Sequence, residues 1–435
     1  MIRGTSQCPG FLPLMPPIPS PYQVVDHLFR HEAGRIVSVL TRIFGLDRLE
    51  LAQDAVQESL LRALQVWPLK GIPENPEGWI MQVAKNVALD TIRRDRGAQD
   101  KRTEVLELYE PEAIFPDVFS EEEIQDDQLR MMFACCHPSL PPEGQIALIL
   151  RTLCGFGEGE IARAFLTNRE TIHKRLVRAR QKLREISPSL DIPDPVKNER
   201  RFPSVLDAVY LLFNEGYNAS TGDLLVRKDL CDEAIRLARL LCRHRSGDRP
   251  EAHALLALML LHGSRLNART DDSGNILLLQ KQKREAWDAV MIREGLAELD
   301  RSASGEKLTR YHLEAGIAAC HCLAPRYEDT DWDRILGLYD VLLRINESPV
   351  VSLNRIVALS HVEGAEAGIR ALMILGEDKR IANYYLFHAV CGEMYARVGN
   401  QRSAREAYAK ALEQTQSTAE KDFLRQRIED LDGHE

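Results

Sequence analysis

Residues 160–176 run Glu160-Ile-Ala-Arg-Ala-Phe-Leu-Thr-Asn-Arg-Glu-Thr-Ile-His-Lys-Arg-Leu176, which is the pattern of two helices joined by a short turn. Ala162, Ile172 and Leu176 occupy the small, branched and aliphatic positions at which a helix-turn-helix locks its helices together. Asn168 is placed to cap the second helix. The sequence therefore predicts a helix-turn-helix. Leu166 stands where glycine is usual, which leaves the geometry of the turn open.

The second helix of this motif has one apolar stripe and a basic outer surface. The stripe consists of Ile172, Leu176, Ala179 and Leu183. The polar residues away from it are Arg169, Glu170, Thr171, His173, Lys174, Arg175, Arg178, Arg180 and Gln181. Side chains of these kinds suit base edges and phosphates in a DNA groove, while a basic surface helix is the plainer alternative. We expect all of them except Gln181 to contact DNA.

Charge is uneven along the chain, although the net charge of −9 argues against indiscriminate nucleic-acid binding. Residues 103–129 contain ten acidic residues and no basic one. A basic cluster at 93–102 precedes this segment, and residues 169–184 hold seven Lys or Arg against one Glu. Two basic islands around an acidic linker are typical of two DNA-contacting modules on a tether.

Length and periodicity predict several helical domains. The 435 residues exceed what one core usually serves, and from Tyr22 apolar residues recur at spacings of three and four. We predict an all-α chain with a flexible Pro-rich tail at 1–21, a first bundle at 22–102, an acidic linker at 103–127, a second bundle at 128–187, a Pro-rich joint at 188–199 and a helical array at 200–432. With no membrane span or secretion signal, we expect a cytoplasmic protein without a membrane partner.

The array carries one repeat signal. The tetratricopeptide (TPR) small and aromatic positions are matched by Gly392, Tyr395, Ala404, Tyr408 and Ala411. Gly399 and Asn400 stand at the turn between the two helices. Because the upstream helices cannot be phased into a strict 34-residue period, we call the array TPR-like.

Two helices of the first bundle have distinctive polar faces. In residues 51–64, Asp54, Gln57, Glu58 and Leu61 share a face opposite Val56 and Leu60. A solvated acidic helix is the plain alternative. In residues 78–94, Asn86, Asp90 and Arg94 lie four residues apart, flanked by Lys85 and Arg93. Such groups can bind base edges and phosphates. The Pro/Gly-rich loop at 67–76, with Lys70 and Asn75, either holds an unstacked base or is an ordinary connector.

Metal binding and catalysis find little support. Cys135-Cys136-His137 and Cys320-His321-Cys322 lack the paired spacing of structural zinc sites. Glu215, within Phe213-Asn-Glu-Gly-Tyr217, has no nearby nucleophile. We expect no metal, no cofactor and no catalytic residue, and therefore a protein that is not an enzyme.

Taken together, three segments resemble extracytoplasmic-function (ECF) sigma factors of bacterial RNA polymerase. They are Asp54-Ala-Val-Gln-Glu-Ser-Leu-Leu-Arg-Ala63, the helix from Trp79 to Arg94, and the helix-turn-helix ending Arg175-Leu-Val-Arg-Ala-Arg-Gln-Lys-Leu183. Beyond residue 200, the segments 210–217, 233–241 and 330–340 resemble the ECF subgroup with a long TPR-like extension.

The resemblance implies specific roles. Asp54, Gln57, Glu58 and Leu61 match the helix that docks on the clamp of the largest subunit of core RNA polymerase. Asn86, Asp90, Arg93 and Arg94 match the helix that reads the −10 promoter element, and the 67–76 loop matches the one that captures a flipped base. Residues 169–180 match the −35 recognition helix. The extension is expected to act as an intramolecular regulatory partner.

Two other classes of protein stay open at this point. A TPR-type regulator would bind DNA through the helix-turn-helix without engaging polymerase, which leaves the Asp54 to Leu61 face unexplained. An enzyme with a nucleic-acid-binding front half would need a phosphate loop, a metal set or a nucleophile with its base, and no such pattern is evident.

Overall fold

A computed structural model of the chain describes residues 20–97, 121–165, 167–186, 190, 201–217, 227–271, 275–415 and 417–432. Across these residues the regular structure is helical, with one isolated bridge between Thr270 and Ile276. The predicted all-α fold is confirmed. Most of the tail, linker and joint expected at 1–21, 103–127 and 188–199 lies outside the described residues, as does Leu166. None of the described helices is long and apolar enough to cross a membrane.

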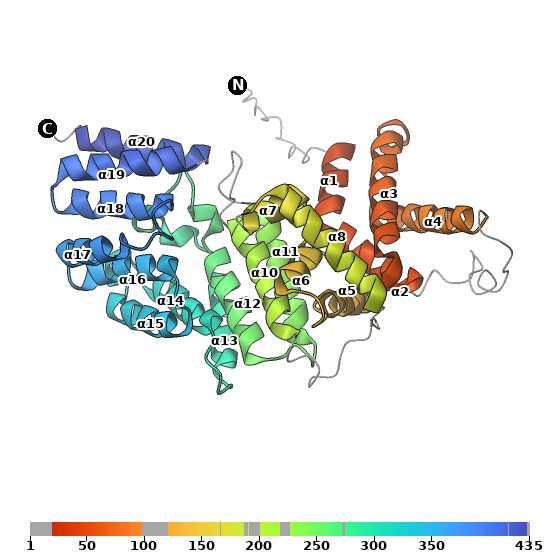
Figure 1. Ribbon diagram of the computed structural model, residues 1–435, viewed down its shortest axis with the longest axis horizontal. Coiled ribbons are helices and arrows are strands. Elements are labelled where there is room, and N and C mark those ends of the chain that lie inside the picture. Colours follow the sequence, from red (N-terminus) through yellow and green to blue (C-terminus); the bar gives the residue numbers. More distant parts are fainter. Residues whose placement is uncertain are drawn as a thin grey trace, which may run out of the picture.

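The first bundle lies at one end of the elongated molecule (Figure 1). Its helices are α1 (Pro21–His31), α2 (Ala33–Phe44), η1 (Leu46–Arg48), α3 (Leu49–Lys70) and α4 (Pro76–Gly97). The helix α3 continues past the break expected at Trp67 and includes Pro68 in its last turn. Trp67 is buried there and packs edge-on against Trp79 of α4, with ring centroids 5.4 Å apart. Gly71, with a φ of +86°, then ends the helix.

The second bundle comprises α5 (Glu121–Cys135), α6 (Pro142–Thr152), α7 (Glu158–Ala164) and α8 (Arg169–Ile186). The helix α5 begins inside the segment for which the sequence predicts a linker. Residues 144–150 of α6 are all buried. The reason is that α6 packs against α8 on one side and against α10 (Phe202–Tyr217) on another. The second bundle therefore packs directly against the first helix of the array that follows it.

The array continues with α11 (Lys228–Arg243), α12 (Pro250–Gly263), η2 (Leu266–Ala268), η3 (Leu279–Lys281), η4 (Arg284–Ala286), α13 (Ala289–Ser302), α14 (Arg310–Leu323), η5 (Tyr327–Asp329), α15 (Trp332–Ile345), α16 (Pro349–Val362), α17 (Ala365–Leu375), α18 (Tyr385–Arg397), α19 (Gln401–Gln414) and α20 (Thr418–Asp432). Successive helices pack against one another. A Cβ on Gly392 of α18 would lie 2.6 Å from the Tyr408 ring of α19, so this small residue permits close packing. The TPR-like assignment stays a prediction.

One apolar core connects the two bundles to the start of the array. Its buried residues run from Val25 in α1 to Ala319 in α14. Smaller clusters stabilise α14–α16, α16–α18 and α18–α20. Since burial of apolar surface is the main favourable term in folding, both bundles and the first helices of the array hold one another in this arrangement.

Candidate nucleic-acid interface

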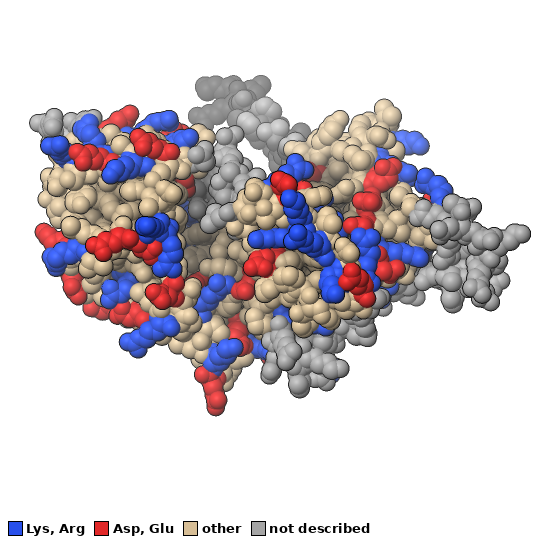
Figure 2. Space-filling view, viewed as in Figure 1, with Lys and Arg blue, Asp and Glu red and all other residues tan. Residues whose placement is uncertain are grey.

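The predicted helix-turn-helix is formed by α7 and α8. Ile172, Leu176, Ala179 and Leu183 are buried as one stripe of α8. Asn168 accepts a hydrogen bond from the backbone N–H of Thr171 at 2.8 Å, which caps the helix. Figure 2 shows Lys and Arg side chains gathered along the outer surface of α8. The local pattern of the sequence therefore folds as expected.

The outer side chains at the start of α8 are held by local contacts. Arg169 Nε and His173 Nδ1 lie 3.3 Å and 2.9 Å from the two carboxylate oxygens of Glu158 on α7. The hydrogen bond from His173 is the main reason why the pKa of Glu158 is lowered. Lys174 pairs with Glu170 at 2.7 Å, one turn apart. These contacts orient the start of α8 relative to α7.

The remaining basic residues of α8 differ in exposure. Arg178 is exposed, and Arg175 lies over the Phe165 ring, with its guanidinium carbon 5.5 Å from the centroid. Arg180 points instead toward the first bundle, where Nη2 donates to Gln53 Oε1 at 2.9 Å. Burial lowers the pKa of Arg180. The sequence places Arg180 on a DNA-facing flank, but in this arrangement it lies between the two bundles.

The polar face of α4 is exposed. Asn86 accepts a hydrogen bond from Gln82 at 3.3 Å, and Asp90 lies 3.5 Å from Arg93. Arg94 Nε donates to the carbonyl oxygen of Asp90 at 3.3 Å. These weak contacts leave the side chains of Asn86, Asp90, Arg93 and Arg94 accessible on a helix that projects from the molecule (Figure 1).

Lys85, expected to flank this face, is 6% exposed, and burial lowers its pKa. Lys85 lies on the side of α4 that packs against the bundle, so it does not belong to the residues that we expect to contact phosphates.

The loop between α3 and α4 is shorter than expected, at residues 71–75. Asn75 accepts a hydrogen bond from the backbone N–H of Gly78 at 2.9 Å and so caps α4. Lys70 is exposed at the end of α3. A side chain engaged as a helix cap is oriented toward its own backbone, so Asn75 has a structural role in this loop.

The polar face of α3 is accessible as well. Asp54 and Gln57 are exposed, and Leu61 is 55% exposed. Glu58 is half-buried and pairs with Arg62 at 2.9 Å. Val56 and Leu60 are buried on the opposite side. The four residues that the sequence groups on one face of α3 are therefore all at least partly accessible, as predicted.

Sequence reasoning missed the residues that join the two bundles. Asp127, at the end of the acidic run, is 2% exposed and binds Arg42 of α2 and Arg130 at 3.0 Å each. Glu50 of α3 lies 3.3 Å from Arg184 of α8. An Asp that is buried within an acidic run of the sequence leaves no pattern there, because only its distant partner Arg42 distinguishes it.

The cysteine clusters form no metal centre among the described residues. Cys135 and Cys136 are buried, and burial raises the pKa of Cys135 to about 12. Thiols in this state are unreactive packing residues.

Family models match three parts of the chain. Residues 28–97 match sigma-70 region 2, residues 130–183 match sigma-70 region 4, and residues 201–303 match a family of unknown function, DUF6596. The two modules with exposed polar helices are thus the two characteristic modules of a sigma factor. An all-α chain that combines them is a transcription initiation factor of the sigma class.

The relatives narrow this class. An uncharacterized protein of Rhizobium meliloti (strain 1021) is 38% identical over 385 residues, which cover 88% of this chain and 90% of that protein. The ECF RNA polymerase sigma factor SigE of Mycolicibacterium smegmatis is 29% identical over 160 residues, covering 37% of this chain and 60% of that protein. No solved structure gives a significant match. The chain belongs to the ECF sigma factors, in the subgroup with a C-terminal extension.

Proposed function

We propose that this chain binds core RNA polymerase in the cytoplasm through α3, directs it to promoters through α4 and α8, and is regulated in cis by its extension. The observation that carries the proposal is the presence of exposed polar faces on all three helices within two sigma modules. The extension is residues 200–432.

The polymerase contact is assigned to Asp54, Gln57, Glu58 and Leu61 of α3. Their shared exposure supports a docking surface for the clamp of the largest subunit, because an exposed leucine supplies apolar area and the carboxylates supply charge complementarity. Burial of Val56 and Leu60 keeps this face turned outward.

We assign recognition of the −10 element to four residues of α4, which are Asn86, Asp90, Arg93 and Arg94. The amide of Asn86 suits paired hydrogen bonds to adenine, and guanidinium groups suit guanine edges or phosphates. The −35 element is assigned to the outer face of α8, where Lys174 and Arg178 are exposed.

We infer that the two modules separate when they occupy one promoter. Elements centred about 25 base pairs apart are separated by about 85 Å of B-form DNA at roughly 3.4 Å per base pair. Here α8 contacts α3 directly, with Arg180 2.9 Å from Gln53. Gly34 of α2 also packs so closely on Leu153, at the end of α6, that an added Cβ would lie 1.9 Å from the Leu153 carbonyl oxygen. We therefore take this arrangement as a closed state.

Contacts from the extension to the second bundle support regulation in cis. Arg227 donates to Glu160 of α7 at 2.7 Å, and Arg236 of α11 donates to Gln128 of α5 at 3.0 Å. Arg201 donates to the carbonyl oxygen of Phe133 at 3.2 Å. Together with the packing of α10 on α6, these contacts let the extension bias the position of α8.

Runoff transcription with purified core polymerase tests the sigma assignment. We expect promoter-specific transcripts from the full chain and none when polymerase is used alone. Tight binding to promoter DNA without any transcript, together with failure to co-purify with core polymerase, would instead support a regulator that never engages polymerase.

Truncation after Ile186 tests the role of the extension. Increased basal transcription would mean that the extension inhibits, and lost transcription with retained helicity would mean that it is needed for activity. We expect the second outcome, because removal of α10 exposes apolar surface of α6. Unchanged output in vitro and in cells, with and without the inducing condition, would contradict regulation in either sense.

A full-length variant removes the problem of exposed apolar surface. Arg227→Ala breaks the ion pair with Glu160, while Arg243→Ala alters an exposed arginine of the neighbouring helix α11 as the matched control. A change of promoter output in the first variant alone supports regulation through this contact.

A further inference from the structure

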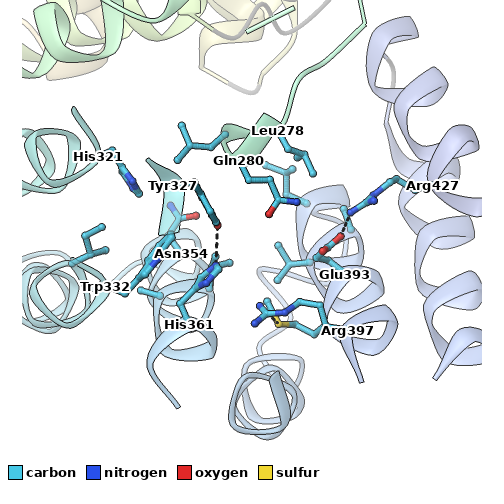
Figure 3. A pocket seen from close by; sticks show the side chains of 18 of the residues that line it. Leu278, Gln280, His321, Tyr327, Trp332, Asn354, His361, Glu393, Arg397 and Arg427 are labelled. Carbon is cyan, nitrogen blue, oxygen red and sulfur yellow. Dashed lines mark hydrogen bonds and ion pairs between the residues drawn. The ribbon is translucent and has the colours of Figure 1, made fainter. Parts of the chain in front are cut away.

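A cavity of about 410 Å³ lies within the C-terminal half of the array, between α14–α16 and α18–α20. Leu278, Leu279 and Gln280 line one edge of it, as Figure 3 shows for Leu278 and Gln280. All its other lining residues lie beyond residue 303, outside the segments that the family models match. Its volume is within the range of roughly 300–1,000 Å³ that is usual for small-molecule sites.

One wall of the cavity is aromatic. The rings of Trp332 and His361 are stacked with centroids 3.9 Å apart and an angle of 9° between their planes. Tyr327 Oη is hydrogen-bonded to His361 Nε2 at 3.1 Å, and His321 lies edge-on to Trp332. Because each ring covers one face of the other, the pair offers an outer ring face and its edges to a planar unsaturated ring.

Both histidines of this wall are uncharged at neutral pH. Burial, together with neighbouring arginines, lowers the pKa of each to about 4. The buried Nδ1 of His321 has no hydrogen-bond partner among the described residues.

The opposite wall is charged (Figure 3). Glu393 forms an ion pair with Arg427 and accepts a hydrogen bond from Tyr408 at 3.1 Å, so these two charges compensate each other. Arg397 donates to Ser360 Oγ at 3.0 Å and to the Ser360 carbonyl oxygen at 3.3 Å. Among the described residues no carboxylate forms an ion pair with Arg397. The lining therefore carries one uncompensated positive charge.

We propose that this cavity binds a small aromatic carboxylate, with its ring against Trp332 and His361 and its carboxylate at Arg397. The neutral aromatic wall selects a planar ring, and the single excess cation selects a single negative charge. A guanidinium binds a carboxylate with paired, charge-assisted hydrogen bonds, which fixes the orientation of the ligand.

The test is isothermal titration calorimetry on the full-length chain. The probes are naphthalene-2-carboxylate, cinnamate and indole-3-acetate, each compared with its uncharged primary amide. We expect at least one acid to bind with a Kd below about 1 mM, and its amide to bind at least about tenfold more weakly.

Variants locate the site. Arg397→Gln should weaken binding of the acid at least about tenfold and leave binding of the amide unchanged, since only the acid uses the charge. Trp332→Ala should weaken both. Arg402→Gln, an exposed arginine of α19 outside the cavity, is the matched control and should change neither. Circular dichroism checks that each variant is folded.

Two results would overturn the proposal: no acid of the set binds below about 1 mM, or the acids bind the Arg397→Gln variant as tightly as the wild type. Because the titration contains neither polymerase nor DNA, its outcome is independent of whether the chain acts as a sigma factor.

Discussion

Replacement of Gly34 by alanine should open the contact between the two bundles. The added Cβ would lie 1.9 Å from the carbonyl oxygen, 2.6 Å from the carbonyl carbon and 2.9 Å from the Cα of Leu153. All three are backbone atoms, so no side-chain rotation relieves the clash. The bundles must move apart by about 1.5 Å before ordinary van der Waals contact is reached.

A displacement of this size weakens the polar contacts across the same interface, which include Arg180 to Gln53 at 2.9 Å and Arg42 to Asp127 at 3.0 Å. Overpacking of this kind typically costs about 1–3 kcal/mol, which shifts the ratio of open to closed molecules about 5–150-fold. The first bundle itself should not suffer, because alanine is the better helix former by roughly 1 kcal/mol.

Small-angle X-ray scattering and the affinity for a promoter duplex that carries both the −10 and the −35 element measure this opening. We expect a larger radius of gyration and tighter DNA binding for Gly34→Ala, with unchanged helicity. Gly337→Ala is the matched control, because a Cβ there meets no atom within 4 Å. Identical scattering and identical DNA affinity for the two variants would refute the closed-state interpretation.

A milder variant covers the case in which Gly34→Ala unfolds. Glu50→Gln removes the carboxylate that lies 3.3 Å from Arg184 and 3.8 Å from Arg180, without adding any atom to the interface. We expect the radius of gyration and the DNA affinity to increase for Glu50→Gln as well, but by less than for Gly34→Ala.

Three further predictions concern the interfaces and the extension. Charge reversal at Asp54 and Glu58 to lysine should abolish co-purification with core polymerase and leave the circular dichroism spectrum unchanged, since both side chains are accessible; wild-type yield would disprove the assignment of α3. Alanine at Lys174 or Arg178 should weaken −35 duplex binding by about 1–3 kcal/mol each if they read bases, whereas an equal loss on all sequences, with a salt slope shallower by about one, would indicate phosphate contacts. Because the pKa of His321 is about 4 when folded and about 6.5 when unfolded, the unfolded state binds more protons between these values. The free energy of unfolding of the extension should therefore fall as the pH drops from about 6.5 toward 4. Urea titrations at pH 7 and pH 5 measure this difference, which should be smaller for His321→Asn than for the wild type.

The sequence by itself determined the local features. The apolar stripe of α8, the Asn168 cap and the outward face of α3 depend on residues three or four apart in one helix, so periodicity and capping preference specify them. The all-α class follows from the same periodicity along the chain.

The tertiary structure decided which of several similar side chains face water and which face another helix. The sequence pattern predicts that both Arg178 and Arg180 contact DNA, yet Arg180 donates to Gln53, 127 residues away, and is partly buried, while Arg178 is exposed. The cavity joins side chains from Leu278 to Arg427, which no local spacing brings together. Contacts between distant residues depend on how helices pack, and a helical period specifies only that a face is buried, not which partner buries it.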